Sequence, residues 1–323
     1  MKVLIIGGTG FLGYHAAQVL LEHHHEITVV GLPPSPPDGL FPPKVSVIIC
    51  DIARLIDSEL TDLMRGHNAI VFAAGVDDRT TPKKPAYPFF FKHNVESVRR
   101  VFSLARQAGV KRGVVLGSYF AYFHRLWPEL ELRRRHPYIR SRVEQAAAAI
   151  EAGGEAMEIC IIELPYIFGS MPGRVPLWKP LINYVLSPFP LFYPAGGTTC
   201  VTVQQVARAI CGAVERGRAG VRYSIGGENL TWVQLLGRIS TLAGKSKKVI
   251  TLPNGVVKVG AWLLRLIHTF EGRESGLEPV SFIDLQTRNT FIDLEDVRLE
   301  LGYAIEDLDS ALMDTLEACR LSS

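Results

Sequence analysis

The chain has 323 residues, of which 47% are hydrophobic and 21% are charged. This length suggests about two domains, and the composition excludes a disordered, fibrous or disulfide-stapled chain. There are 35 basic and 32 acidic residues, so the formal net charge is only +3. A nucleic-acid-binding protein usually concentrates basic residues on one face, and we therefore expect no nucleic-acid partner.

The first half of the chain alternates short apolar segments with helical ones. Residues 2–6 form a continuous apolar run, which is typical of a strand buried on both faces. A glycine-rich turn, a helix at 14–21 and a strand at 26–30 follow. Further strands are predicted at 45–49, 69–73, 113–116 and 159–164, with a helix at 94–108. This alternation predicts an α/β fold, a doubly wound parallel (Rossmann) sheet with helices on both faces.

Two local features interrupt this alternation. The segment from Pro33 to Pro43 contains six prolines in eleven residues, which predicts an extended surface loop because proline fixes φ and lacks an N–H. A ligand for a proline-binding module is the alternative. The run His23 to His25 follows the first helix and raises the question of a metal site. No other ligand cluster lies nearby in sequence, so we predict a solvated turn and no metal.

The pattern changes after Pro165, where prolines divide the chain into loops. Regular structure resumes with a strand at 200–203, a helix at 206–214, a strand at 223–225 and a helix at 232–243. We expect residues 1–165 to form a dinucleotide-binding domain, to which elements from about 198–226 return. Residues 166–323 would form mainly an interleaved substrate-binding lobe. The apolar segment Val256 to Phe270 is interpreted as a core or lid helix, with a membrane-surface helix as the alternative.

The five cysteines are odd in number, widely scattered and without a C-x-x-C pair. This spacing predicts neither a disulfide framework nor a zinc site. Unpaired cysteines are typical of a reducing compartment, so we expect a cytoplasmic protein. The chain has no run of about 18 apolar residues, so we expect no membrane-spanning helix.

The glycine turn carries the strongest functional signal. Gly7, Gly10 and Gly13 form G-x-x-G-x-x-G between a buried strand and a helix, the context of a dinucleotide-binding fingerprint. Gly7 would permit the tight turn, Gly10 the approach of the backbone to the pyrophosphate, and Gly13 the close packing of the helix. The helix N-terminus would meet the negative charge of the pyrophosphate.

The segment from Ile6 to Gly13 resembles the signature of the extended short-chain dehydrogenase/reductases, the NAD(P)-dependent epimerase/dehydratase superfamily. The resemblance runs along nearly the whole chain and implies a Rossmann fold, a smaller C-terminal substrate lobe and an NAD(P) cofactor. It implies that the following residues bind the cofactor: Gly7, Gly10, Phe11, Leu12, Gly13, Gly31, Asp51, Ile52, Ala73, Ala74, Gly75, Pro165, Tyr166 and Ile167.

The same resemblance implies a catalytic set of Ser118, Tyr138 and Arg142, with arginine in place of the family's lysine. Tyr138 and Arg142 are four residues apart, which places them on one face of a helix. Tyr138 would be the acid/base, Ser118 would orient the substrate oxygen, and Arg142 would hold the ribose and lower the tyrosine pKa from about 10. Because arginine does not release a proton, the family's proton relay is in question.

The resemblance implies an NAD(P)-dependent oxidoreductase or epimerase acting at a hydroxyl or ketone carbon of a small molecule, either a sugar nucleotide or an apolar alcohol. The arginine at position 142 leaves an alternative, an NAD(P)-binding sensor or assembly protein with little catalysis. We expect the substrate pocket to be built from residues 119–122, 165–193 and the second lobe. Many family members dimerise through a four-helix bundle, so a homodimer is plausible by resemblance, whereas a membrane partner is not expected.

Two positions depart from the family's pattern. The second strand ends at Gly31 and Leu32, where NAD-selective members carry an acidic residue and NADP-selective members often carry an arginine. Neither is present, so the choice between NAD and NADP stays open. Glu163 stands where an arginine often precedes the proline, which indicates a divergent subfamily.

Overall fold

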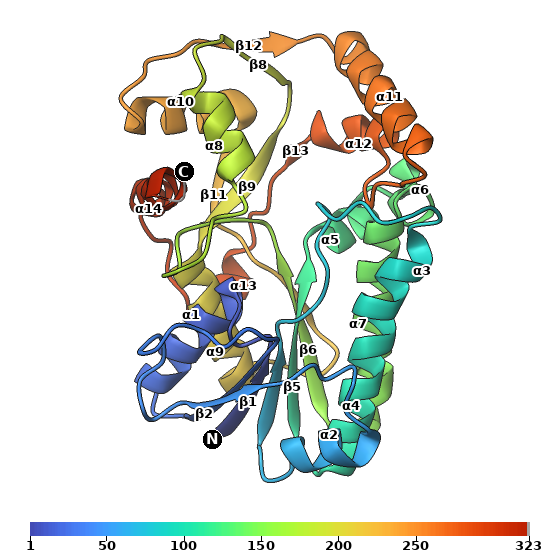
Figure 1. The fold of residues 1–323 in the computed structure, drawn as a ribbon, viewed down its shortest axis with the longest axis vertical. Coiled ribbons are helices and arrows are strands. Elements are labelled where there is room, and N and C mark those ends of the chain that lie inside the picture. Colours follow the sequence, from blue (N-terminus) through green and yellow to red (C-terminus); the bar gives the residue numbers. More distant parts are fainter. Residues whose placement is uncertain (322–323) are drawn as a thin grey trace.

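The main sheet contains seven parallel strands in the order β10-β6-β5-β4-β1-β2-β3 (Figure 1). The structure is a computed structural model that describes residues 1–321. The chain reverses direction across the sheet between β1 and β4, the position at which such sheets bind ligands. The strands are β1 (Lys2–Ile6), β2 (Glu26–Gly31), β3 (Ser46–Ile49), β4 (Ala69–Phe72), β5 (Arg112–Ser118), β6 (Glu158–Leu164) and β10 (Arg222–Ser224).

Helices cover both faces of this sheet. α1 (Phe11–Glu22) and α9 (Val203–Arg216) pack on one face, with α13 (Glu295–Leu301) against α9, and α2 (Asp57–Met64), α4 (Ser97–Gln107) and α7 (Pro137–Gly153) cover the other (Figure 1). Alternate residues of β1 point to opposite faces, so Val3 and Ile5 enter one apolar core while Leu4 and Ile6 enter the other. This division explains why the strand is apolar at every position.

Short helical segments connect these elements on the face that carries α7. They are α3 (Tyr87–Phe90), the π-helical η1 (Phe91–Glu96), α5 (Phe120–Leu126), η2 (Pro128–Leu130), α6 (Leu132–Arg135) and η3 (Gly154–Ala156). α5 follows β5 directly, so it lies at the carboxyl edge of the sheet, where the loops of a parallel sheet form binding sites.

A second group of elements surrounds a smaller sheet. Its strands are β7 (Tyr166–Phe168), β9 (Gly197–Thr202), β11 (Glu228–Thr231) and β13 (Asn289–Thr290), and a separate pair consists of β8 (Leu191–Pro194) and β12 (Val249–Leu252). The helices are α8 (Lys179–Leu186), α10 (Trp232–Leu242), α11 (Asn254–Phe270), α12 (Pro279–Gln286) and α14 (Leu308–Leu321). β10 is a strand of the main sheet and α9 covers that sheet, whereas β9 pairs within the smaller sheet. A domain boundary near residue 165 stays a proposal.

The predicted parallel sheet with helices on both faces is confirmed. The interpretation of residues 256–270 as a core or lid helix is wrong for the core alternative, because no residue of α11 is buried. The lid and membrane-surface alternatives stay predictions. The outward side chains of α11 include Val259, Leu263 and Phe270, which are exposed to 60%, 50% and 88%. α11 is attached mainly to α12, partly through an ion pair between Lys258 and Asp284 (2.6 Å). Among residues 1–321, no helix is long and apolar enough to cross a bilayer.

Glu163 is fully buried and is compensated by Arg125. Both carboxylate oxygens of Glu163 accept hydrogen bonds from the Arg125 guanidinium at 2.7 Å, and the Ser224 hydroxyl donates a third at 2.7 Å. The acidic residue that marked a divergent subfamily is therefore one half of an ion pair between β6 and α5. An unpaired charge at this position would be strongly destabilising.

We expect Arg125→Ala to lower the free energy of unfolding by about 2–3 kcal/mol, because Glu163 would remain buried and unpaired. The double variant Arg125→Ala with Glu163→Gln removes both charges and should recover at least about 1 kcal/mol of that loss. Urea denaturation of the wild type and both variants measures these differences. A double variant no more stable than Arg125→Ala would show that the charge on Glu163 is not the cause.

Candidate active site

The glycine turn, the end of β5 and the start of α7 meet around one cavity of about 320 Å³. The carboxyl ends of parallel strands lie along one edge of a sheet, so residues distant in sequence are brought together there. Twelve of the predicted residues line this cavity: Gly7, Gly10, Phe11, Leu12, Gly13, Ala73, Gly75, Ser118, Tyr138, Pro165, Tyr166 and Ile167.

The backbone of the glycine turn requires glycine at two positions. Gly7 has φ +85°, and a Cβ on it would lie 2.8 Å from the carbonyl carbon of Ala73. A Cβ on Gly13 would lie 2.4 Å from the carbonyl oxygen of Gly7, so α1 begins directly against the turn. These contacts agree with the turn and packing roles that the sequence predicts. The residues of the first turn of α1, whose N–H groups have no partner within the helix, line the cavity.

Gly10 and Arg174 together form a site that fits a pyrophosphate. Gly10 precedes the first turn of α1, and an Arg174 guanidinium nitrogen lies 3.6 Å from the position that a Cβ on Gly10 would occupy. Both residues line the cavity. An anion at this point would meet glycine backbone, a helix N-terminus and a guanidinium, which is the combination that binds phosphate groups. Sequence reasoning did not single out Arg174.

Tyr138 is fixed by its backbone as well as by its ring. It is the second residue of α7, and its N–H donates to the carbonyl oxygen of Gly276 (2.9 Å), from the loop before α12. Its own carbonyl oxygen accepts from the Ser141 hydroxyl (2.7 Å), which in turn accepts from the Asn94 amide (3.1 Å). Asn94 also bonds to both the N–H and the carbonyl oxygen of Val76. η1, α7 and the loop after β4 are thereby joined behind the phenol.

Arg142 is buried one helical turn after Tyr138. Its Nε donates to the Tyr138 hydroxyl oxygen at 3.1 Å, and one terminal nitrogen donates to the Gln145 side chain at 2.8 Å. The terminal nitrogens also approach the carbonyl oxygens of Leu116 (3.5 Å) and Val76 (3.3 Å). A guanidinium has five N–H groups, so most of its donors already have protein acceptors. The contact with Tyr138 follows from the four-residue spacing seen in the sequence.

The pKa of Tyr138 is raised above its usual value because the phenol is buried, although the Arg142 cation opposes that shift. Hydrogen bonding from Ser118 lowers the pKa further but does not reverse the outcome. We expected Arg142 to lower the tyrosine pKa, and it does so only in part. The hydroxyl is therefore protonated at neutral pH, a state that can donate a proton to an acceptor in the cavity.

Five predicted residues do not line the cavity: Gly31, Asp51, Ile52, Ala74 and Arg142. Gly31 ends β2, and a Cβ there would lie 2.0 Å from the Thr9 hydroxyl, so glycine makes room for the turn. Asp51 accepts from the N–H of Ala53 (3.0 Å) and pairs with Arg54 (3.3 Å). That Asp51 and Ile52 bind the cofactor stays a prediction.

Sequence reasoning missed the charged segment Asp77, Asp78 and Arg79, which follows β4 and lines the cavity. Burial raises the pKa of Asp78, and the Arg79 cation opposes that shift. Asp78 also raises the pKa of Tyr138, so the two groups share one electrostatic environment. The one sequence feature that could have identified this segment is its position directly after a central strand, since loops after the central strands of a parallel sheet form the binding crevice. The predicted pocket segments 119–122 and 165–193 do contribute, through Tyr119, Phe120 and residues up to Trp178.

Residues 3–226 match the model of the NAD dependent epimerase/dehydratase family. The chain belongs to this family. It is therefore an NAD(P)-dependent enzyme, and the matched region runs from β1 into the loop after β10.

Known relatives are similar over the full length of the chain. A protein of Synechocystis sp. with the name "Putative dihydroflavonol 4-reductase" is 22% identical over 329 residues, which cover 97% of this chain and 92% of the relative. The crystal structure of gox2253 is similar with a TM-score of 0.81 at 22% identity, covering 100% of this chain and 98% of the other. The UDP-glucuronic acid 4-epimerase of Bacillus cereus, solved with UDP-glucuronic acid and NAD, has a TM-score of 0.71 at 16% identity and 100% coverage of both chains. These similarities confirm the fold.

We expect Gly10→Val to weaken NAD(P) binding by at least about 100-fold, or ~2.7 kcal/mol, because the side chain would occupy the space of the pyrophosphate. Arg174→Ala should weaken binding by about tenfold, since it removes one charge-assisted contact. Calorimetric titration with NADH and NADPH measures both, and thermal melting without cofactor controls for folding. Unchanged affinity in folded Gly10→Val would place the cofactor elsewhere.

Proposed function

We propose that the chain is an NAD(P)H-dependent reductase that converts a ketone or aldehyde on an apolar, ring-containing small molecule to an alcohol. The observation that carries this proposal is the position of Tyr138, a buried tyrosine that lines the cavity beside the glycine turn and accepts a hydrogen bond from Arg142. Burial raises the pKa of Tyr138, which keeps the phenol protonated. A protonated phenol suits reduction, because the carbonyl oxygen must gain a proton as the carbon gains a hydride. Oxidation of the alcohol would need the phenolate instead.

Each side chain then has a defined task. Bound NAD(P)H supplies the hydride. Tyr138 donates its hydroxyl proton to the substrate oxygen, and Ser118, which ends β5 in the same cavity, holds that oxygen in line. Arg142 donates from Nε to the phenol oxygen and so directs the phenol proton away from itself, toward the cavity. Because arginine does not release a proton, Tyr138 would recover its proton through the cavity rather than through Arg142.

The remaining walls favour an apolar substrate. Phe120, Tyr166, Val175, Leu177 and Trp178 line the cavity, and aromatic and aliphatic walls bind rings by burial and stacking. The Trp178 indole N–H donates to the carbonyl oxygen of Ile167, which fixes one of these walls against β7. The Synechocystis relative is named as a reductase, in agreement with this proposal.

A sugar-nucleotide substrate, such as that of the Bacillus cereus epimerase, would need cations for its diphosphate. Among the described residues lining the cavity, the cations are Arg79 and Arg174. Arg79 pairs with Asp77 (3.4 Å) and lies over the Trp178 ring, and Arg174 lies beside Gly10. The other arginines that could suggest an anionic substrate lie in ion pairs with glutamates: Arg125, Arg133, Arg134, Arg135 and Arg140. We therefore propose an apolar carbonyl compound as the substrate, with a sugar nucleotide as the second candidate.

We expect Tyr138→Phe to lower kcat for carbonyl reduction by at least about 100-fold while leaving NAD(P)H affinity nearly unchanged, since only the proton donor is lost. Arg142→Lys keeps a cation near the phenol and restores the family residue, so its activity should stay within about tenfold of the wild type or rise. Stopped-flow absorbance of reduced nicotinamide across a panel of aromatic ketones and UDP-sugars measures both. Full activity in Tyr138→Phe would contradict the assignment. No turnover in any form would favour the binding-protein alternative.

The raised pKa of Tyr138 also predicts how the rates of carbonyl reduction and of alcohol oxidation depend on pH. The pKa of Tyr138 is raised above the usual value of about 10, so the phenol stays protonated at lower pH. The kcat for reduction should therefore be nearly constant from about pH 6 to 9. Oxidation uses the phenolate, whose fraction rises about tenfold per pH unit in this range, so its kcat should rise with pH. Steady-state rates in both directions test this. A reduction rate that falls steeply between pH 7 and 8 would contradict the protonated phenol.

A further inference from the structure

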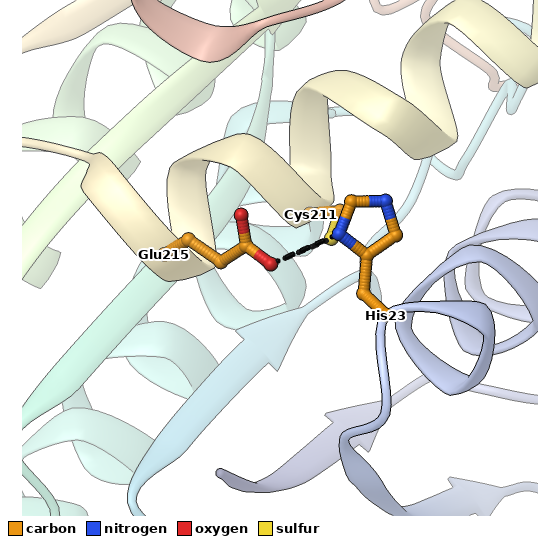
Figure 2. Close-up of side chains that lie close together, drawn as sticks. All are labelled: His23, Cys211 and Glu215. Atoms are coloured by element: carbon orange, nitrogen blue, oxygen red, sulfur yellow. Dashed lines mark hydrogen bonds and ion pairs between the residues drawn. The ribbon is translucent and has the colours of Figure 1, made fainter.

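Four side chains with metal-binding atoms meet on the face of the sheet covered by α1 and α9. Glu215 Oε1 lies 3.0 Å from His23 Nδ1, 3.2 Å from His25 Nε2 and 3.6 Å from Cys211 Sγ. The ligand atoms of His23, Cys211 and Glu215 all lie within 4.8 Å of one another (Figure 2). Sequence reasoning took the histidine run as a solvated turn, and that is wrong for His25, which is buried.

Local structure explains why these side chains converge. Cys211 and Glu215 are four residues apart on α9, so they share one face of that helix. His23 caps the end of α1, and His24 adopts the left-handed conformation with φ 62°. That reversal lets His23 and His25 both reach Glu215, while His24 points into solvent. The histidine run lies nearly 190 positions before Cys211 and Glu215 in sequence, so no spacing pattern in the sequence predicts the cluster.

We propose that His23, Cys211 and Glu215 form a site for a zinc-like divalent transition ion that joins the end of α1 to α9. His25 lies outside this ligand set and holds the Glu215 carboxylate by a hydrogen bond. An imidazole, a thiol and a carboxylate are donor types that tetrahedral zinc prefers, and water can take the fourth position. Zinc bonds of about 2.0 Å to nitrogen and oxygen and about 2.3 Å to sulfur give tetrahedral edges of about 3.3 Å and 3.5 Å. The distances from Glu215 Oε1 to His23 Nδ1 (3.0 Å) and to Cys211 Sγ (3.6 Å) are close to these edges.

The surroundings agree with such a site. Three donors converge on one carboxylate oxygen, which offers two lone pairs, so hydrogen bonding alone satisfies this arrangement poorly. The other oxygen of Glu215 pairs with Arg216 at 3.0 Å, and His25 Nδ1 lies 3.2 Å from the Met1 amino nitrogen. On binding, the cation replaces the thiol proton of Cys211, which leaves to solvent, and the His23 imidazole binds as a neutral ring. The site lies at the C-terminal end of α1, whereas the glycine turn precedes its N-terminal end. Its role is therefore to hold that helix in place.

The test uses untagged full-length protein, treated with a chelator and then titrated with Co²⁺ and Zn²⁺ in the absence of NAD(P). We expect one Co²⁺ per chain, a thiolate-to-cobalt charge-transfer band, displacement by Zn²⁺, and a higher melting temperature with Zn²⁺. Cys211→Ser should remove the band, and His23→Gln should weaken Zn²⁺ binding by at least about tenfold.

His24→Asn is the matched control, because asparagine tolerates the left-handed conformation and the side chain points away from the cluster. It should bind both ions as the wild type does. A wild-type protein that gives no charge-transfer band with Co²⁺, or a band that persists in Cys211→Ser, would overturn the proposal. An equal loss of Zn²⁺ affinity in His24→Asn and in His23→Gln would also overturn the proposal. None of these readouts depends on catalysis, so they stand apart from the proposed reductase activity.

Discussion

Arg142 places a permanent positive charge inside the protein, and the candidate site is arranged around that charge. A guanidinium cannot be neutralised by losing a proton, so its burial requires acceptors on every side. The carbonyl oxygens of Leu116 and Val76, the Gln145 side chain and the Tyr138 hydroxyl provide them. These groups come from the end of β5, the loop after β4 and α7. Satisfying one cation therefore fixes the three segments that border the cavity.

This constraint also decides the state of the phenol. The Nε–H of Arg142 occupies one lone pair of the Tyr138 oxygen, and burial raises the pKa of Tyr138 despite the nearby cation. The site thus offers a protonated, oriented hydroxyl rather than a phenolate. A lysine at position 142 would bring a smaller, mobile ammonium that can exchange protons. With arginine the phenol is held more rigidly and its proton must be exchanged through the cavity.

Much of this fold follows from local sequence, and the failures have physical reasons. Buried strands such as residues 2–6 and the turn from Gly7 to Gly13 are specified by short apolar runs and by glycines that allow no Cβ. The pair Tyr138 and Arg142 follows from helical spacing. α11 was misjudged because an apolar segment predicts a helix but not what covers it, and its apolar residues are exposed. Asp78, Arg174 and the contact of His25 with Glu215 depend on long-range packing that no local pattern encodes.

The ionisation of Tyr138 decides whether the site holds a protonated phenol. A pH titration of ultraviolet phenolate absorbance, taken as the difference between wild type and Tyr138→Phe, isolates this one phenol from the other nine tyrosines of the chain. We expect a midpoint above the usual value of about 10, because burial outweighs the Arg142 cation. A difference spectrum showing phenolate with a midpoint below about 8 would contradict it, and would make Tyr138 a base poised for oxidation.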